Sequence, residues 1–114
     1  MCDKNEALSI LGEVYERCSP ILPISDAYLY GSYALGDYRP YSDVDIMLIT
    51  PLPDNDIRAR NMKVSEIVGE MCIDHDVTIF VSVRSRDQFK PQSLPYHRNI
   101  VTEGIRYNAG GISA

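Results

Sequence analysis

Apolar residues recur at helical spacing in two long stretches of the chain. From residue 6 to residue 18 they fall three or four positions apart, which predicts a helix, and the following Ser19-Pro20 pair ends it. The second stretch begins at Asp54, an acidic residue that favours a helix start, and its apolar stripe continues to Met71. Two amphipathic helices are therefore expected, each with one face toward a common core.

Three short runs have the composition of β-strands instead. Residues 27–30 are apolar and aromatic and end at Gly31. Residues 43–50 are mostly apolar and end at Pro51. Residues 76–83 are rich in β-branched side chains, which is typical of a central strand.

The last third of the chain carries shorter signals. Residues 85–88, Ser-Arg-Asp-Gln, resemble a capping box and predict a short helix. A further helix is expected over residues 96–103, with Gly104 at its end. Residues 105–107 are expected to form an edge strand and residues 108–114 a frayed tail.

The order of these elements predicts a small α/β (α+β) domain, with a mixed β-sheet and helices packed mainly on one face. A chain of 114 residues is long enough for one core, so residues 1–114 are expected to form a single domain. The sequence contains no internal repeat and no low-complexity tract.

Composition and charge exclude several classes of protein. No apolar run approaches the ~18 residues that cross a bilayer, and the polar, acidic start resembles no leader peptide, so a cytoplasmic protein is expected. The net charge of −5 disfavours extended nucleic-acid binding, although a small anionic ligand could bind together with a divalent cation. Cys2, Cys18 and Cys72 lack the spacing of a disulfide framework or a zinc ribbon and are expected to be reduced and incidental.

Two aspartates one residue apart open the second predicted strand. Side chains alternate across a strand, so Asp43 and Asp45 project from the same face and form an oxygen-rich platform suited to Mg²⁺ or Mn²⁺. If the third predicted strand is a neighbour, Asp76 at its start lies beside them and completes a two-metal site or supplies a general base. The plainer alternatives are a solvated strand end for the pair and a loop carboxylate for Asp76, with Asp74 as a rival for the third position.

A glycine-containing turn precedes the aspartate pair. Gly31 ends a strand and permits close backbone approach, and the amides of the helical turn that follows, with the Ser32 hydroxyl, can cradle phosphate oxygens. Gly36 would keep the loop close to the ligand. Phosphate at this turn, metal at the aspartates and a base at Asp76 together indicate nucleotidyl transfer from a nucleoside triphosphate.

The Gly-Ser pair, ten further residues, the Asp-Val-Asp triplet and an aspartate on a later strand form a motif that resembles the DNA polymerase beta-like nucleotidyltransferase superfamily. The chain is most similar to the minimal nucleotidyltransferase branch. The resemblance implies that Gly31 and Ser32 bind the triphosphate and that Asp43 and Asp45 hold Mg²⁺. It also implies that Asp76 completes the metal site and activates the attacking hydroxyl.

The resemblance, which covers roughly residues 27–107, implies transfer of AMP from ATP to a hydroxyl with release of pyrophosphate. Members of this branch often act as antitoxins to a small helical partner of the HEPN type. Because the chain has no second lobe for an acceptor, such a partner or the mate in a homo-oligomer is expected to provide the acceptor surface.

One feature departs from the family pattern. The family commonly has a basic residue in the Gly-Ser-x-x-x-Gly turn, whereas Tyr33, Ala34 and Leu35 occupy these positions here. Either transfer is slow, or Arg39 or a cation of a partner compensates for the phosphate charge. The alternative function is therefore a nucleotide-binding antitoxin or regulatory subunit without turnover.

Tyrosines crowd around the motif and offer flat surfaces for a nucleobase. The loop contains Tyr33, Tyr38 and Tyr41, any of which could stack on a base or simply line the loop.

Overall fold

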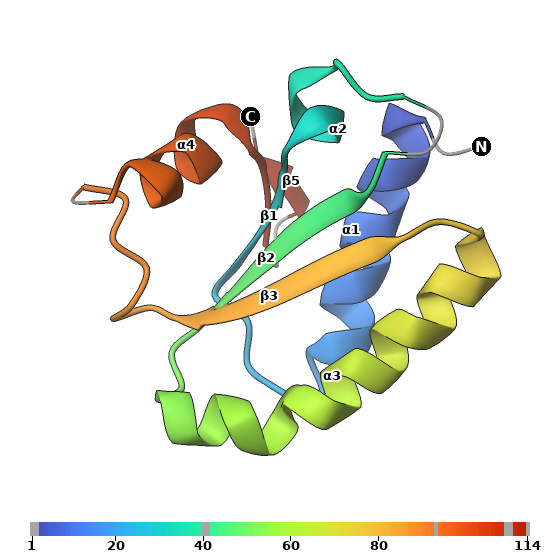
Figure 1. Ribbon diagram of the computed structural model, residues 1–114. Helices are drawn as coiled ribbons and strands as arrows, with labels where there is room; N and C mark the ends of the chain where they lie inside the picture. Colours follow the sequence, from blue (N-terminus) through green and yellow to red (C-terminus); the bar gives the residue numbers. More distant parts are fainter. Residues whose placement is uncertain (1–2, 40–41, 93, 109–110, 114) are drawn as a thin grey trace.

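The computed structural model describes residues 3–39, 42–92, 94–108 and 111–113 (Figure 1). The elements follow in the order α1 (Lys4–Cys18), β1 (Asp26–Tyr30), α2 (Ser32–Leu35), β2 (Val44–Thr50), α3 (Asp54–His75), β3 (Ile79–Ser85), α4 (Pro95–Glu103), β4 (Ile105–Asn108) and β5 (Gly111–Ser113). Both predicted long helices and the first two predicted strands are present with nearly the expected bounds. Cys2 and Tyr41 lie outside the described residues.

The described strands form one mixed sheet in the order β3-β2-β1-β4-β5. β2 and β3 are parallel, and the other neighbouring pairs are antiparallel. The fold class predicted from the sequence is therefore confirmed. The expected edge strand and frayed tail are wrong for the described part of the C-terminus, because β5 pairs with β4 and makes β4 an interior strand.

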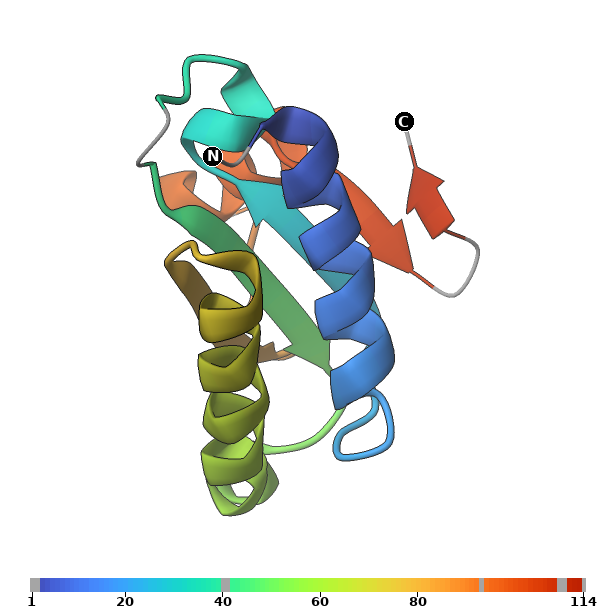
Figure 2. The ribbon, with the colours of Figure 1, turned by 90° about the vertical axis from the view of Figure 1, so that its right-hand side faces the viewer.

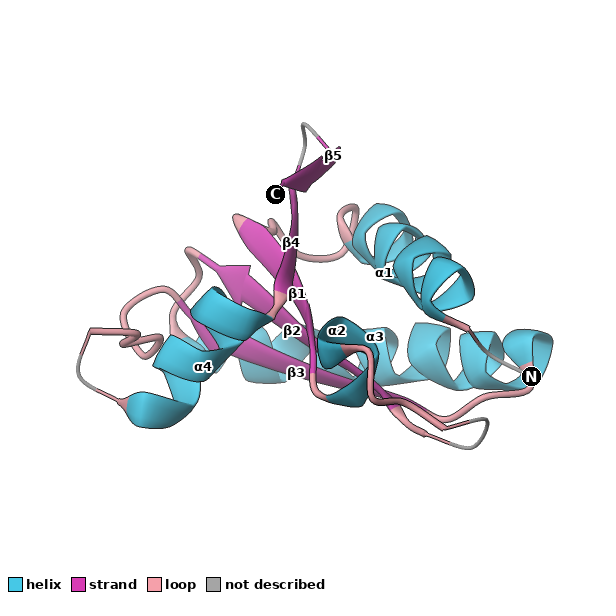
Figure 3. Cartoon of the chain, turned by 90° about the horizontal axis from the view of Figure 1, so that it is seen from above, coloured by secondary structure: helices cyan, strands magenta, loops and turns pink. Residues whose placement is uncertain are grey.

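Helices cover the two faces of the sheet unequally. The long helices α1 and α3 lie on one face (Figure 2), and α4 lies on the opposite face (Figure 3). The prediction that helices pack mainly on one face is confirmed, because both long helices lie on the same face. The face that carries α4 is only partly covered, and the candidate site lies there.

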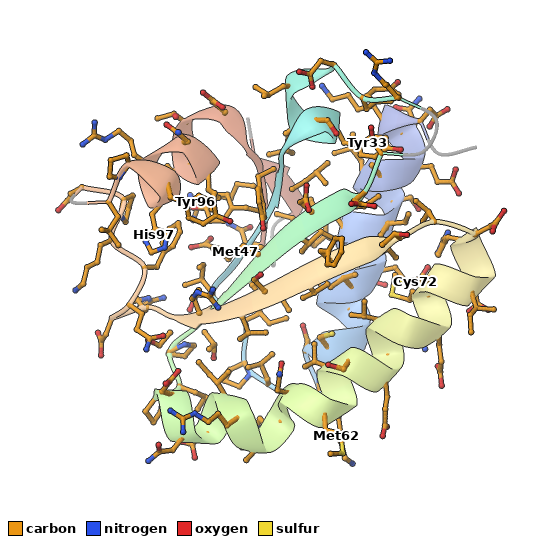
Figure 4. The ribbon with its side chains drawn as sticks, viewed as in Figure 1. Tyr33, Met47, Met62, Cys72, Tyr96 and His97 are labelled. Carbon is orange, nitrogen blue, oxygen red and sulfur yellow. The ribbon has the colours of Figure 1, made fainter. Side chains whose placement is uncertain are left out.

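Alternation along β2 divides the buried side chains between two cores. Val44, Ile46 and Leu48 point toward α1 and α3 and are buried in the larger core. Met47 and Ile49 point the other way and pack with Tyr28 and Ile100 beneath α4 (Figure 4). Asp45 shares the parity of Met47 and so belongs to the face that carries α4.

The strand predicted over 76–83 starts later than expected. α3 continues to His75, and Asp76 is its C-cap in the left-handed conformation (φ 52°, ψ 48°). The N–H of Asp76 donates to the carbonyl oxygens of Cys72 and Ile73, which closes the helix. Asp76 therefore ends a helix, and β3 begins only at Ile79.

No helix forms at residues 85–88, so this expectation is also wrong. Ser85 is the last residue of β3, and its hydroxyl accepts a hydrogen bond from the N–H of Gln88 at 3.2 Å. The hydrogen bond that a capping box makes at a helix start is thus present here, but it stabilises a turn. Pro91 follows shortly afterwards, and a proline disfavours helix in the residue before it.

Among the described residues, no helix is long and apolar enough to span a bilayer. Cys18 and Cys72 are free thiols, as expected, and burial raises the pKa of Cys18 to about 11.

Candidate active site

Gly31 lies directly against the carboxylate of Asp45. The preceding residue, Tyr30, is paired with Asp45 across the antiparallel strands β1 and β2. Gly31 has φ 76° and ψ −152°, a conformation that is essentially restricted to glycine. A Cβ atom at this position would lie 2.6 Å from Oδ2 of Asp45. The glycine therefore makes room for the carboxylate at the end of β1.

The turn after Gly31 is a single helical turn, α2, as the sequence predicted. Leu35 N–H donates to the carbonyl oxygen of Gly31 at 3.1 Å, and Gly36 N–H donates to that of Ser32 at 2.9 Å. Gly36 ends the turn with φ 86°. The first N–H groups of a helical turn have no carbonyl partner within it, so those beside Ser32 can serve a bound group.

Asp43 and Asp45 form the acidic part of the site. Asp43 is exposed just before β2, and Asp45 is half-buried within it. Burial raises the pKa of Asp45 above its usual range, and the negative charge of Asp43 raises it further. The two carboxylates thus repel each other, and a divalent cation held by both would offset this repulsion. Two aspartate carboxylates are the oxygen donors that Mg²⁺ prefers, so these residues fit such an ion.

The third carboxylate expected from the sequence does not join this pair. β3 is the parallel neighbour of β2, as predicted, but the residue in register with Asp45 is Phe80. Asp76 lies at the end of α3, ahead of β3, and is exposed. Among the described residues, no group of three or more His, Cys, Asp or Glu side chains could hold a metal ion. The structure therefore brings Asp43 and Asp45 together without Asp76, and the roles of Asp76 as a third metal ligand and as a base stay predictions.

Phe80 is the residue of β3 that is in register with Asp45. Ile79 and Val81 pack toward α1 and α3, so Phe80 projects from the same face as Asp45. Its side chain is 54% exposed. The exposure of a large aromatic residue beside the carboxylate pair was not predicted from the sequence.

Two tyrosine hydroxyls lie beside the carboxylate pair. The hydroxyl oxygens of Tyr30 and Tyr96 are 3.3 Å apart, and the rings meet edge to face. Burial raises the pKa of Tyr30, with smaller contributions from Tyr96 and from the charge of Asp45. Tyr30 is therefore a neutral hydrogen-bonding group at physiological pH.

A pocket of about 200 Å³ opens between α4 and the turn at Gly31. Its walls include Tyr30, Gly31 and Leu35 on one side and Tyr96, Asn99 and Glu103 of α4 on the other. Sequence reasoning missed these α4 residues. Their spacing is that of one helical stripe, but only the return of the chain through β4 places this stripe beside Gly31.

The loop tyrosines have more structural roles than the sequence suggested. Tyr33 is fully buried, and its ring stacks on that of Tyr38 with centroids 4.6 Å apart. Stacking on a nucleobase would require Tyr33 to leave the core. Arg39, the expected compensating cation, is exposed in the loop that follows.

The fold and the glycine-aspartate contact define the class of protein. The profile of the family described as "Nucleotidyltransferase domain" matches residues 11–108. The chain therefore belongs to the nucleotidyltransferase domain family.

A relative from Methanocaldococcus jannaschii bears the name "Putative protein adenylyltransferase MJ0604". It is 33% identical over 82 residues, which are 71% of this chain and 75% of the relative. The family and this relative confirm the predicted class of enzyme, a nucleotidyltransferase of the adenylyltransferase type.

Two solved structures are similar in fold. One is a mutant of the MntA-HpeT toxin-antitoxin, with a TM-score of 0.56 and 15% identity over 87% of this chain and 70% of that chain. The other is a toxin-antitoxin with AMP-PNP, with a TM-score of 0.54 and 17% identity over 82% of this chain and 68% of that chain. At these identities the likeness establishes the shared fold.

Proposed function

We propose that this chain transfers AMP from ATP to a hydroxyl group of a partner protein and releases pyrophosphate. The observation that carries the proposal is the contact between Gly31 and Asp45, which joins the turn at Ser32 to the carboxylate pair. The family supports the type of reaction, and the name of the archaeal relative supports a protein acceptor.

The roles of the residues follow from their positions. The hydroxyl of Ser32 and the free amides of its turn donate hydrogen bonds to the triphosphate oxygens, and Gly31 keeps this surface free of a side chain. Asp43 and Asp45 hold Mg²⁺. When bound, this ion supplies positive charge that polarises the phosphoryl group.

The reaction forms one bond and breaks another. The acceptor oxygen bonds to the α-phosphorus of ATP, and the bond from that phosphorus to the bridging oxygen breaks, so pyrophosphate leaves. The proton of the acceptor hydroxyl must pass to a base or to water. Asp76 was the expected base, but its position at the C-cap of α3 provides no support for this role.

We propose that the acceptor is a helical partner of the HEPN type, bound in a cytoplasmic toxin-antitoxin pair. The solved structures of similar fold belong to toxin-antitoxin proteins, which supports this choice. The net charge of −5 argues against RNA or DNA as the acceptor, because these require a basic surface.

A second candidate is a nucleotide-binding antitoxin without turnover. Two observations favour it: Phe80 takes the place of a third carboxylate in register with Asp45, and the exposed Leu35 lies in the turn where a basic residue would help to hold phosphate. In this case ATP and Mg²⁺ still bind, but no AMP is transferred.

Intact-mass spectrometry separates the two candidates. The chain is co-expressed with the product of the adjacent gene, incubated with ATP and Mg²⁺, and both proteins are weighed. We expect one or more AMP additions on the partner and a loss of several orders of magnitude in rate with Asp43→Asn or Asp45→Asn. Asp37→Asn, an exposed loop residue, is the control. Nucleotide binding without any mass gain would establish the second candidate.

A further inference from the structure

The pocket between α4 and Gly31 is continuous with the proposed phosphate site. Gly31 belongs to both, because it starts the phosphate turn and also lines the pocket. The volume of about 200 Å³ is below the ~300–1,000 Å³ of sites that enclose a whole drug-sized ligand. A pocket of this size suits one part of a nucleotide, with the triphosphate lying outside it along the turn.

The polar residues of α4 lie along the pocket in a definite order. Ile105 pairs with Leu29, and a Cβ at Gly104 would lie 3.0 Å from the carbonyl oxygen of Leu29. The C-terminal end of α4 is therefore the end nearest Gly31, and Glu103 is at that end. Asn99 lies one turn further back, about 6 Å along the helix axis, and Tyr96 follows at the far end.

These side chains are available to a ligand. Asn99 and Glu103 are exposed, and their side chains make no hydrogen bond with another described residue. The Tyr96 ring, 55% exposed, presents an aromatic surface at the same opening. Apolar surface from Leu35 and Ile100 completes the walls.

The chemistry of this series matches the order of groups in an adenosine nucleotide. A carboxylate near the phosphates can accept hydrogen bonds from ribose hydroxyls, as acidic residues do in dinucleotide-binding folds. An asparagine amide pairs with N6 and N7 of adenine through one acceptor and one donor, whereas the same edge of guanine presents two acceptors, N7 and O6. A tyrosine ring packs against the base.

We propose that this pocket is the nucleoside subsite, in which Glu103 binds the ribose, Asn99 selects adenine and Tyr96 packs against the base. The inference rests on the proposed function, since it assumes that the triphosphate lies at Gly31 and Ser32. In this proposal, residues of α4 select the nucleotide, whereas separate residues, Asp43 and Asp45, hold the metal.

Calorimetric titration with four probes tests the subsite. ATP, GTP, dATP and inorganic tripolyphosphate are titrated into the chain in the presence of Mg²⁺. We expect Asn99→Leu to weaken ATP about tenfold and to abolish the preference over GTP, because a bidentate base contact is lost. Glu103→Leu should remove the preference for ATP over dATP. Binding of tripolyphosphate should change in neither variant.

Matched controls come from the exposed side of α3. Asn61→Leu and Glu66→Leu make the same changes far from α4 in sequence and on the opposite face of the sheet. If tripolyphosphate and ATP both fail to bind the unaltered chain, the proposed function is overturned. If both bind but Asn99→Leu leaves the ratio of ATP to GTP affinity unchanged, the subsite is overturned. If the α4 variants keep their nucleotide affinities but no longer transfer AMP to the partner, the pocket instead binds the acceptor, and the subsite is overturned.

Discussion

Oδ2 of Asp45 occupies the space in which a side chain at position 31 would begin, 2.6 Å from the place of a Cβ on Gly31. Glycine is therefore required here for two reasons, the positive φ of the backbone and the proximity of the carboxylate. The same contact fixes the distance between the proposed phosphate turn and the proposed metal ligand, so a change at either residue should affect both.

Substitution of Gly31 by alanine should cost more than the same change at Gly36. Gly36 also has a positive φ, but a Cβ there meets no atom within 4 Å, so Gly36→Ala carries the backbone strain alone, about 1 kcal/mol. Gly31→Ala adds displacement of the Asp45 carboxylate, and we expect a loss of at least ~2 kcal/mol together with loss of Mg-ATP binding. Urea denaturation and calorimetry measure the two effects. Equal losses for both variants would show that the carboxylate moves aside freely.

Replacing Asp45 by asparagine should stabilise the chain in the absence of ligands at neutral pH. The pKa of Asp45 is raised in the folded state, so its contribution is most favourable below the unfolded pKa and is lost as the pH rises through the folded pKa. The advantage of Asp45→Asn should therefore be present at pH 7, amount to a few degrees in Tm at most, and vanish toward about pH 3.5.

Thermal melts across this pH range test the expectation, with Asp37→Asn as the exposed control. Addition of ATP and Mg²⁺ should reverse the order, because the unaltered chain gains stability from the ligands and the variant does not. An advantage that persists unchanged at acidic pH would contradict the assignment to the carboxylate charge.

Introducing an acidic residue at position 80 should add a third carboxylate beside Asp43 and Asp45. Phe80 is in register with Asp45, and about half of its surface is already in contact with solvent, so the fold should tolerate Phe80→Asp. We expect about tenfold tighter Mg²⁺ binding, because hard cations favour additional carboxylate oxygens, and a lower Tm without metal, because three like charges then adjoin. Phe80→Asn is the neutral control. Identical Mg²⁺ affinities for the two variants would show that a carboxylate at position 80 does not reach the ion held by Asp45.

Asp76→Gly should be tolerated and should slightly stabilise the fold. Asp76 has φ 52° at the C-cap of α3, where glycine is the preferred residue, so we expect a gain of about 0.5–1 kcal/mol in the free energy of unfolding. Transfer of AMP should stay within a few-fold of the unaltered rate. A fall of several orders of magnitude, with the stability gain retained, would instead establish Asp76 as the base that the sequence suggested.

Sequence reasoning succeeded where the signal was local. The Gly-Ser turn and the two aspartates are close along the chain, and β1 and β2 pair as neighbours, so their proximity follows from two short strands and the turn between them. The helices α1 and α3 are long enough for their apolar stripes to be unambiguous.

Prediction from the sequence failed where the structure depends on contacts between residues far apart in the chain. Val77 and Thr78 have the composition of a strand, but α3 extends to His75 and β3 therefore begins later than expected. The register of two parallel strands also depends on both strands, so it cannot be predicted from the sequence of either strand alone. As a result, the residue of β3 in register with Asp45 is Phe80, and not the aspartate that the sequence suggested. The α4 pocket was missed because it depends on the return of the chain through β4.

The proposed phosphate turn and the aspartate pair both lie within residues 31–45, whereas β3 and α4 reach the site after long connections. Short loops close with little loss of chain entropy, so β1, α2 and β2 should assemble early in folding and open late in native-state hydrogen exchange. The helix α4, proposed to select the nucleotide, would then be the less protected segment. Local unfolding of α4 could release the nucleoside while Gly31 and Asp45 keep their native contact.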